Sequence, residues 1–359
     1  MWSKKYKGNC MKVERPTILF RCDASEQIGS GHVMRCITLA QELSRKGASV
    51  VFATNSGGHE VIQRFAISPM KTVPIHNNYS EVNQLREIIV GLGIDYLIWD
   101  SYRIELDHFN YIADLVPTML VDDIYLFSQF KCDAVLNQNI YATADRYSQV
   151  NTKPTLLMGT DFSMLRDAFQ LYAPYIKSIS DQAEKVLLTF GGADLENNTI
   201  HFIKELLKFQ KFSLQISIVL GVHYPYEHQL SHFINHEKVT DIHSVQMYRN
   251  VTNMADLIWE QDLAVTAGGS TMYELACLGV PSLCVITADN QRDLVGTFHS
   301  KGISIEINQD GDDFLNKFST LVESSASRKE MSRIGRHTID GKGKHRVAEY
   351  ILHTVRRAL

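Results

Sequence analysis

Short apolar runs alternate with stretches of helical periodicity along most of the chain. The run at 17–22 (TILFRC) predicts a strand. Beyond it, apolar residues at 33, 36, 37, 40 and 43 fall on one face of a helix, and Gly47 stands where that helix would end. The run at 48–53 predicts the next strand. Further strands are predicted at 95–100, 118–123 and 134–139, and this alternation is typical of a parallel, doubly wound sheet.

A second series of strands is predicted later in the chain, after a linker at 171–181. Its members are 185–190 (KVLLTF), 214–220 (LQISIVL), 263–267 (LAVTA), 281–286 (PSLCVI) and 304–307 (SIEI). We therefore expect an α/β protein with two Rossmann-like, doubly wound domains that face a central cleft. The expected boundaries are an N-terminal extension at 1–16, a first domain at 17–172 and a second domain at 173–359. Ligands of such sheets bind beyond the carboxyl ends of the strands.

Composition narrows the class of partner. The chain has 359 residues, which is long for one domain and favours two, and 45% of them are hydrophobic and 21% charged, as in ordinary globular proteins. A formal net charge of −4 gives no electrostatic reason to expect nucleic acid or an anionic membrane as partner. A small anionic ligand stays possible, because backbone amides can bind it without net positive charge. The sequence leaves the oligomeric state open, with a monomer favoured.

The cysteines and the N-terminal residues indicate the cellular compartment of the protein. Six scattered cysteines form no CxxC pair, which favours reduced thiols over disulfides or a zinc site. Residues 1–16 are basic, look loosely attached and lack the apolar stretch of a secretion signal. No apolar run approaches the roughly 18 residues of a membrane span. A cytoplasmic protein without membrane insertion is expected.

The segment at 21–36 (RCDASEQIGSGHVMRC) carries the first candidate chemistry. Gly29, Ser30 and Gly31 permit a tight turn, and a helix is predicted to begin near His32. The free N–H groups of a helix N-terminus favour an anion and disfavour a cationic imidazole. They are therefore expected to keep His32 neutral, as a general base requires. Spacing alone leaves open a structural loop with a packed histidine, and the segment does not match GxGxxG.

Two later strand ends also carry glycine pairs. Gly191 and Gly192 follow the strand at 185–190, and Gly268 and Gly269 follow the strand at 263–267. Next come Ser270 and Thr271, with Glu274 one helical turn farther along. Glycine amides with two hydroxyls suit a diphosphate, and a nearby carboxylate suits ribose hydroxyls. A glutamate near a helix start is also a common dipole partner, so a structural role stays open.

Three other polar groups are candidates for a functional role. Asn290 and Gln291 follow a predicted strand and could hold sugar hydroxyls or acetamido groups, or form an ordinary polar turn. The pair at 122–123 could supply acid/base carboxylates, but structure or ligand positioning is favoured. His228, His232 and His236 would share one helical face, as metal ligands can. No carboxylate or cysteine completes that set, so no metal is expected.

The segment at 21–36 resembles the signature of the PseG family, the UDP-sugar hydrolases of the bacterial pseudaminic acid pathway. The similarity extends over most of 17–345. It includes the stretches at 100–102, 122–123, 136–142, 159–169, 190–194, 266–274 and 290–291. The stretch at 266–274 is the less specific, because MurG-like glycosyltransferases share it.

This resemblance implies a GT-B fold that holds UDP mainly in its second domain. It further implies hydrolysis of UDP-2,4-diacetamido-2,4,6-trideoxy-β-L-altropyranose to the free sugar and UDP, without metal or cofactor. His32 would be the general base that activates water, and Asn290 would position substrate or water. The residues expected to contact the substrate or UDP are Arg21, Asp23, Gly29, Ser30, Gly31, Arg35, Asp123, Gly191, Gly192, Gly268, Gly269, Ser270, Thr271, Glu274 and Gln291.

Two other functions stay open on the sequence alone. A MurG-like UDP-sugar glycosyltransferase would need a second sugar or a lipid as acceptor. A non-catalytic protein would bind the nucleotide sugar without consuming it. The sequence does not decide whether water or a sugar hydroxyl occupies the position of the nucleophile.

Overall fold

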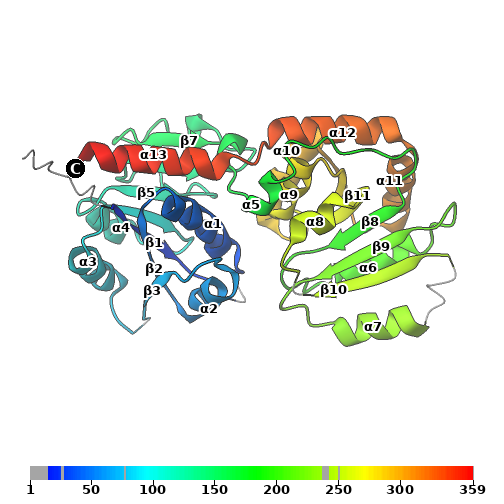
Figure 1. The fold of residues 1–359 in the computed structure, drawn as a ribbon, viewed down its shortest axis with the longest axis horizontal. Helices are drawn as coiled ribbons and strands as arrows, with labels where there is room; N and C mark the ends of the chain where they lie inside the picture. Colours follow the sequence, from blue (N-terminus) through cyan, green and yellow to red (C-terminus); the bar gives the residue numbers. More distant parts are fainter. Residues whose placement is uncertain (1–14, 26–27, 77, 237–241, 250, 359) are drawn as a thin grey trace, which may run out of the picture.

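The computed structural model describes residues 15–25, 28–76, 78–236, 242–249 and 251–358. They form two lobes, each built on one parallel sheet with helices on both faces (Figure 1). The expected extension at 1–16 lies, up to residue 14, outside the described residues. The α/β class and the two doubly wound, Rossmann-like sheets predicted from the sequence are confirmed.

The first lobe holds a seven-stranded sheet in the order β3-β2-β1-β4-β5-β6-β7. Its strands are β1 (Thr17–Cys22), β2 (Ser49–Thr54), β3 (Lys71–Pro74), β4 (Tyr96–Asp100), β5 (Thr118–Val121), β6 (Ala134–Asn137) and β7 (Thr155–Met158). Its helices are α1 (Gly31–Arg45), α2 (Ser56–Phe65), α3 (Glu81–Leu92), α4 (Leu106–Ala113) and η1 (Ala144–Tyr147). The central strands are buried on both faces, which explains why they read as continuous apolar runs.

The second lobe holds a six-stranded sheet in the order β10-β9-β8-β11-β12-β13. Its strands are β8 (Lys185–Thr189), β9 (Gln215–Leu220), β10 (Ser244–Arg249), β11 (Leu263–Ala267), β12 (Ser282–Val285) and β13 (Ser304–Ile307). The helices are α6 (Asn198–Leu206), α7 (Glu227–His236), α8 (Met254–Trp259), α9 (Thr271–Leu278), η4 (Asp289–Gln291), α10 (Arg292–Ser300), α11 (Gly311–Glu323) and α12 (Ser325–Thr338).

Three strands that the sequence analysis did not find all lie at sheet edges. They are β3, β7 and β10. Edge strands have one neighbour instead of two, so their side chains are less completely buried and need not be apolar. In β10, for example, no residue is fully buried. The local pattern of such a strand is correspondingly weak.

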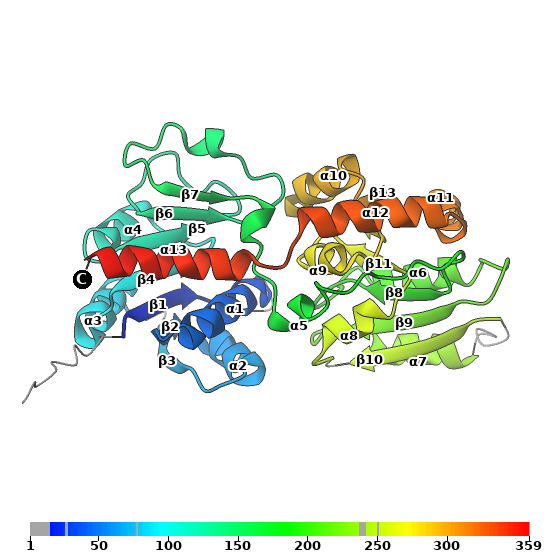
Figure 2. The same ribbon diagram turned by 45° about the horizontal axis from the view of Figure 1, so that its top comes forward.

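The chain crosses between the lobes twice. The segment after β7 contains η2 (Thr160–Phe162) and α5 (Asp167–Gln170), and Phe169 of α5 is buried in the core of the second lobe. The last helix, α13 (Gly343–Ala358), returns to the first lobe, where it lies along α1 (Figure 2). Its Val347, Ile351 and Val355 belong to the core under β1. By packing, α13 thus lies with the first sheet, although its sequence position had assigned it to the domain at 173–359.

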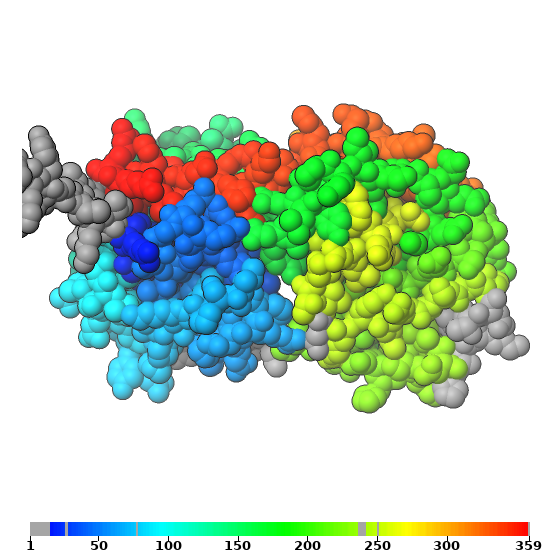
Figure 3. Space-filling view, in the orientation of Figure 1, coloured from blue at the N-terminus to red at the C-terminus, as the bar shows by residue number. Residues whose placement is uncertain are grey.

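A hollow parts the lobes below the junction formed by these crossing segments, as the space-filling view shows (Figure 3). Across the junction, the loop after β6 contacts α9. Ile140 and Tyr141 of that loop pack against the core of the second lobe. Within the described residues, no helix has the length and apolarity needed to cross a membrane.

Candidate active site

The strand order reverses between β1 and β4, and the segment around His32 begins at that point. β1 and β4 are hydrogen-bonded neighbours, and Cys22 at the end of β1 is in register with Asp100 at the end of β4. The chain leaves these two strand ends in opposite directions across the sheet. A crevice at such a switch point is the usual ligand site of an open α/β sheet.

His32 is the second residue of α1, close to the predicted helix start. Gly29 has a positive φ of 70° and donates its N–H to the carbonyl of Ser25 (2.8 Å), which closes the turn before the helix. The first bond along the helix runs from Met34 N–H to the carbonyl of Ser30 (2.9 Å). The preceding N–H groups of the first turn therefore point beyond the helix end, as an anion site requires.

A buried carboxylate fixes the imidazole. Nδ1 of His32 lies 2.5 Å from Oδ1 of Asp100, which is fully buried. Arg35, one helical turn after His32, donates from Nε and Nη2 to the two oxygens of Asp100 at 2.6 Å each. With Nδ1 donating to Asp100, Nε2 is left to accept a proton. In the sequence, the helix terminus and the family resemblance both point to His32 as a base, and the structure adds this carboxylate and this guanidinium.

The charge of Arg35 determines the ionisation of Asp100. Burial by itself would raise the pKa of this carboxyl, but the guanidinium of Arg35 and then the contact with His32 lower the pKa well below its usual range. Asp100 is thus an anion wherever the protein is folded near neutral pH. Arg35 was predicted to contact substrate, yet its guanidinium is occupied by Asp100 and Asp123.

Asp123 connects more elements of the site than Asp122 does. Oδ2 of Asp123 accepts bonds from Arg35 Nη1 (2.7 Å) and the hydroxyl of Tyr102 (3.1 Å), and Oδ1 accepts one from Asn139 (2.9 Å). Asp122 accepts backbone N–H groups of its own turn, including that of Leu126 (3.1 Å), and the hydroxyl of Tyr147 in η1 (3.1 Å). The sequence analysis named Asp123 but did not name Tyr102 or Asn139 individually as site residues.

A pocket of about 260 Å³ opens beside His32. The ring of Tyr102 stands edge-on to the imidazole, with 4.4 Å between the ring centroids. The other lining residues are Asp23, Ser25, Ile28, Asn55, Asp100, Ser101 and Arg103. The pocket is large enough for one monosaccharide-sized group, and it places a histidine, hydroxyls and an amide around it.

Arg21 and Asp23 are held by the protein itself. Arg21, whose side chain is 5% exposed, pairs with Asp23 (2.7 Å) and with Glu81 at the start of α3 (2.5 Å). Asp23 also accepts the N–H of Asn55 (2.8 Å). Of the two, only Asp23 lines the pocket, so the geometry places Arg21 as a support for the strand end.

The glycine-bearing ends of β8 and β11 flank the switch point of the second sheet, as β1 and β4 do in the first. Gly191 has a positive φ of 82°. A Cβ on Gly268 would lie 2.5 Å from Val295, so only glycine fits there. Gln291 holds this corner, because its Oε1 accepts the N–H groups of Gly268 (3.2 Å) and Thr287 (2.9 Å). Its neighbour Asn290 is exposed.

Helix α9 begins at Thr271, directly after Ser270, whose side chain makes no capping bond. The hydroxyl of Ser270 is therefore available to a ligand. Glu274 is 15% exposed, and burial raises its pKa while the nearby Arg166 works in the opposite direction. Arg166 comes from the segment before α5 and donates to Glu274 at 3.1 Å. Nothing local in the sequence marks Arg166 as a partner of Glu274, 108 positions away.

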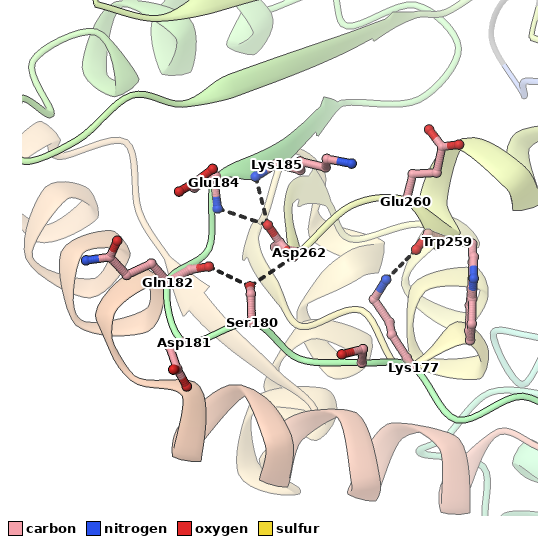
Figure 4. Close-up of a pocket in the computed structure, with 10 residues that line it drawn as sticks. Lys177, Ser180, Asp181, Gln182, Glu184, Lys185, Trp259, Glu260 and Asp262 are labelled. Atoms are coloured by element: carbon pink, nitrogen blue, oxygen red, sulfur yellow. Dashed lines mark hydrogen bonds between the residues drawn. The ribbon is translucent and has the colours of Figure 1, made fainter.

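A larger pocket, of about 730 Å³, lies at the opposite edge of the second sheet (Figure 4). There Asp262 accepts the N–H groups of Glu184 and Lys185, both at 2.9 Å, at the amino ends of β8 and β11. Lys177 donates to the carbonyl of Trp259 and lies over its ring, and burial lowers the pKa of Lys177 to about 8. The polar groups that line this pocket bond to one another. The pocket lies at the amino ends of the strands, whereas ligands of such sheets bind beyond the carboxyl ends.

The histidines at 228, 232 and 236 lie on α7, as the spacing predicts, although the side chain of His236 lies outside the description. Among the described residues, no group of three or more His, Cys, Asp or Glu side chains is arranged to hold a metal ion.

The arrangement of the two lobes is that of the GT-B fold. MurG of Acinetobacter baumannii superposes with a TM-score of 0.68 over 94% of this chain and 99% of that one, at 14% identity. At this identity the likeness shows the fold alone.

No family model matches the chain. It is 27% identical over 284 residues to an uncharacterized protein of Methanocaldococcus jannaschii, covering 78% of this chain but 57% of that relative's length. It is 24% identical to the spore coat polysaccharide biosynthesis protein SpsG of Bacillus subtilis, over 90% of this chain and 94% of the relative. It is 25% identical to the UDP-2,4-diacetamido-2,4,6-trideoxy-beta-L-altropyranose hydrolase of Campylobacter jejuni, over 80% and 98% respectively.

Proposed function

We propose that this chain hydrolyses UDP-2,4-diacetamido-2,4,6-trideoxy-β-L-altropyranose, or a close relative of it, to the free sugar and UDP. The observation that carries the proposal is the pairing of His32 with buried Asp100 beside a sugar-sized pocket. The likeness to the Campylobacter jejuni hydrolase over nearly the whole of that protein supports the choice of substrate. The GT-B fold is consistent with a nucleotide sugar held between two lobes.

In the proposed reaction, Nε2 of His32 takes a proton from water as the water oxygen bonds to the anomeric carbon. The bond between that carbon and the β-phosphate oxygen breaks, and UDP leaves with the electron pair. Asp100 holds the imidazole in the tautomer that accepts the proton and stabilises the imidazolium. The N–H groups at the start of α9 and the hydroxyls of Ser270 and Thr271 would stabilise the leaving diphosphate. Asn290 is proposed to position substrate or water.

The test is turnover of the UDP-linked diacetamido sugar in H₂¹⁸O with EDTA present. We expect UDP release with the label in the free sugar. Label in UDP would move the attack to phosphorus and remove the proposed role of His32. An absolute need for added divalent metal would refute the metal-independent reaction.

A UDP-sugar glycosyltransferase is the second candidate, and one observation favours it. A pocket of about 660 Å³ shares Asn55 with the pocket beside His32 and is lined partly by Pro74 and Ile75, where an acceptor could bind. Absence of UDP release until a sugar or lipid acceptor is added would establish this function instead.

A further inference from the structure

One tyrosine joins the two halves of the proposed site. Tyr273 belongs to α9 in the second lobe, and its hydroxyl donates to Oδ1 of Asn139 (3.2 Å) in the first. The same hydroxyl accepts the N–H of Ile140 (3.1 Å). Tyr273 is only 4% exposed, and its ring packs edge-on against Phe298 at 5.2 Å between centroids. The hydroxyl is therefore held at a defined place on the loop after β6.

From Asn139 an unbroken set of bonds leads to the imidazole. Asn139 donates to Asp123 (2.9 Å), and Asp123 accepts a bond from Arg35 (2.7 Å). Arg35 donates two hydrogen bonds to Asp100, and Asp100 contacts His32. Asp100 and Asp123 are at least 90% buried, with exposures of 0% and 9%. In such surroundings the loss of one partner leaves a charged or polar group without its bond, so the members of the set are energetically coupled.

The backbone of Tyr273 lies directly after the segment at 268–271, which is predicted to hold UDP and is called the UDP loop below. It is the third residue of α9, after Ser270 and Thr271, and it directly precedes Glu274. A ligand that binds the start of α9 therefore acts on the same helical turn that carries the tyrosine. A displacement of that turn moves the hydroxyl relative to Asn139 and Ile140.

We propose that Tyr273 is a positioning residue that couples occupation of the UDP loop to the orientation of His32, through Asn139, Asp123, Arg35 and Asp100. The inference rests on the proposed function, because it takes UDP as the ligand of the second lobe. With UDP bound, the tyrosine holds the loop after β6 in place and so keeps the Asp123 end of the set fixed. When the Tyr273 hydroxyl does not hold the loop after β6, His32 and Asp100 are still present in the first lobe, but their surroundings are less well ordered.

The direct test measures amide hydrogen exchange at Ile140, with and without UDP, in the wild-type protein and in Tyr273→Phe. This substitution removes the hydroxyl and leaves the ring packing. We expect UDP to slow exchange of the Ile140 amide severalfold in the wild type and to leave it unchanged in Tyr273→Phe. Equal slowing in both proteins, or none in a wild type that binds UDP, would overturn the coupling.

Kinetic measurements distinguish a coupling role of Tyr273 from a purely structural one. Tyr273→Phe is expected to keep the Kd for UDP within twofold of wild type and to lower kcat roughly fivefold to tenfold, the effect of one hydrogen bond. Asn139→Ala should lower kcat similarly, and the double variant no further. Tyr350→Phe is the control, because its hydroxyl contacts the carbonyl of Asp133 before β6, at the amino edge of the first sheet. A loss confined to UDP affinity, or fully additive variants, would refute the proposal.

The outcomes distinguish this inference from the proposed function. Absence of UDP binding, measured by calorimetry, refutes both. Binding and hydrolysis without an effect on Ile140 refute the coupling alone. A UDP effect on Ile140 that disappears in Tyr273→Phe supports the coupling even if the wild type transfers its sugar to an acceptor instead of water.

Discussion

Nδ1 of His32 lies 2.5 Å from Oδ1 of Asp100, although the two residues are 68 positions apart. The contact exists because β1 and β4 are neighbours whose carboxyl ends meet at the switch point of the first sheet. Buried Asp100 presents one oxygen to the imidazole and both oxygens to Arg35. The fold thus supplies a histidine with an oriented proton and an accessible second nitrogen.

Replacement of His32 by alanine tests the proposed base. We expect kcat to fall by about 10²–10⁴, the usual contribution of a general base, while the Kd for UDP stays near that of the wild type, since UDP is assigned to the other lobe. The measurements are UDP release and calorimetric binding of UDP. His108→Ala is the control, because the side chain of that histidine on α4 is 43% exposed and pairs with Glu105 at the start of its own helix. Undiminished turnover in His32→Ala would refute the proposed mechanism.

Asp100→Asn should lower both activity and stability. The amide can no longer orient Nδ1–H reliably, and Arg35 keeps only Asp123 as an anionic partner. We expect kcat to fall at least about 100-fold and the free energy of unfolding to drop by about 3–5 kcal/mol, as when one member of a buried pair is lost. Turnover and urea unfolding measure the two effects. Asp107→Asn, at an exposed position in the first turn of α4, should leave kcat unchanged and cost at most about 1 kcal/mol of stability. Wild-type kcat in Asp100→Asn would contradict the assignment.

Acid stability follows from the same carboxyl group. The charge of Arg35 lowers the pKa of Asp100 in the folded protein despite its burial. In the unfolded chain its pKa is about 3.9. The native pairing therefore stabilises the fold above that pH, and the contribution is lost as pH falls below about 4 towards the folded pKa. Urea unfolding from pH 7 to pH 2 should show a steeper decline below pH 4 in the wild type than in Asp100→Asn. Parallel curves would show that Asp100 does not contribute.

Glu274→Gln tests the assignment of the ribose site. If the carboxylate accepts ribose hydroxyls, its loss should weaken UDP binding about 10–100-fold, the value of a bond to a charged group. Binding of 2′-deoxy-UDP, which lacks one of those hydroxyls, should change less. Calorimetry with both nucleotides measures the difference, and Glu330→Gln serves as control, because the Glu330 side chain on α12 is exposed and pairs with Arg333 of the same helix. Equal losses for both nucleotides would instead favour a general role in support of α9 through Arg166.

Helix α13 should be required for the first lobe to fold. A fragment of residues 17–172 lacks Val347, Ile351 and Val355, each fully or almost fully buried in that lobe. Burial of each such side chain contributes about 1.5–3 kcal/mol, and a whole domain has only about 5–15 kcal/mol of stability. The fragment should therefore lack a cooperative thermal transition by circular dichroism.

Attachment of residues 341–358 to that fragment should restore folding. A short linker suffices, since Gln170 donates to the carbonyl of Gly341 at 2.5 Å. The same extension with Val347 and Ile351 changed to serine is the control and should not restore the transition. A cooperative transition in 17–172 alone would confirm the boundary expected from the sequence and contradict the structural role of α13.

The sequence predicted the central strands and the edge strand β13, but it missed the edge strands β3, β7 and β10, for one physical reason. β1, β4, β8 and β11 are buried on both faces and must be continuously apolar, so their runs are visible in the chain. β10 is at the sheet edge, where it pairs with β9, and none of its residues is fully buried, so it tolerates polar residues at most positions. The glycine pairs at the ends of β8 and β11 are likewise visible in the sequence, whereas the close approach of Val295 to Gly268 is set by the tertiary structure.

What the sequence by itself determined is therefore the local and periodic part: alternating strands and helices, two lobes, and the strand ends that bear His32 and the glycine pairs. Only the tertiary structure decided which polar side chains meet. Strand order brings Asp100 to His32, and lobe contact brings Tyr273 to Asn139. It also decided that α13 completes the first lobe. Such contacts join residues far apart in the chain, and no local pattern of apolar and polar positions encodes them.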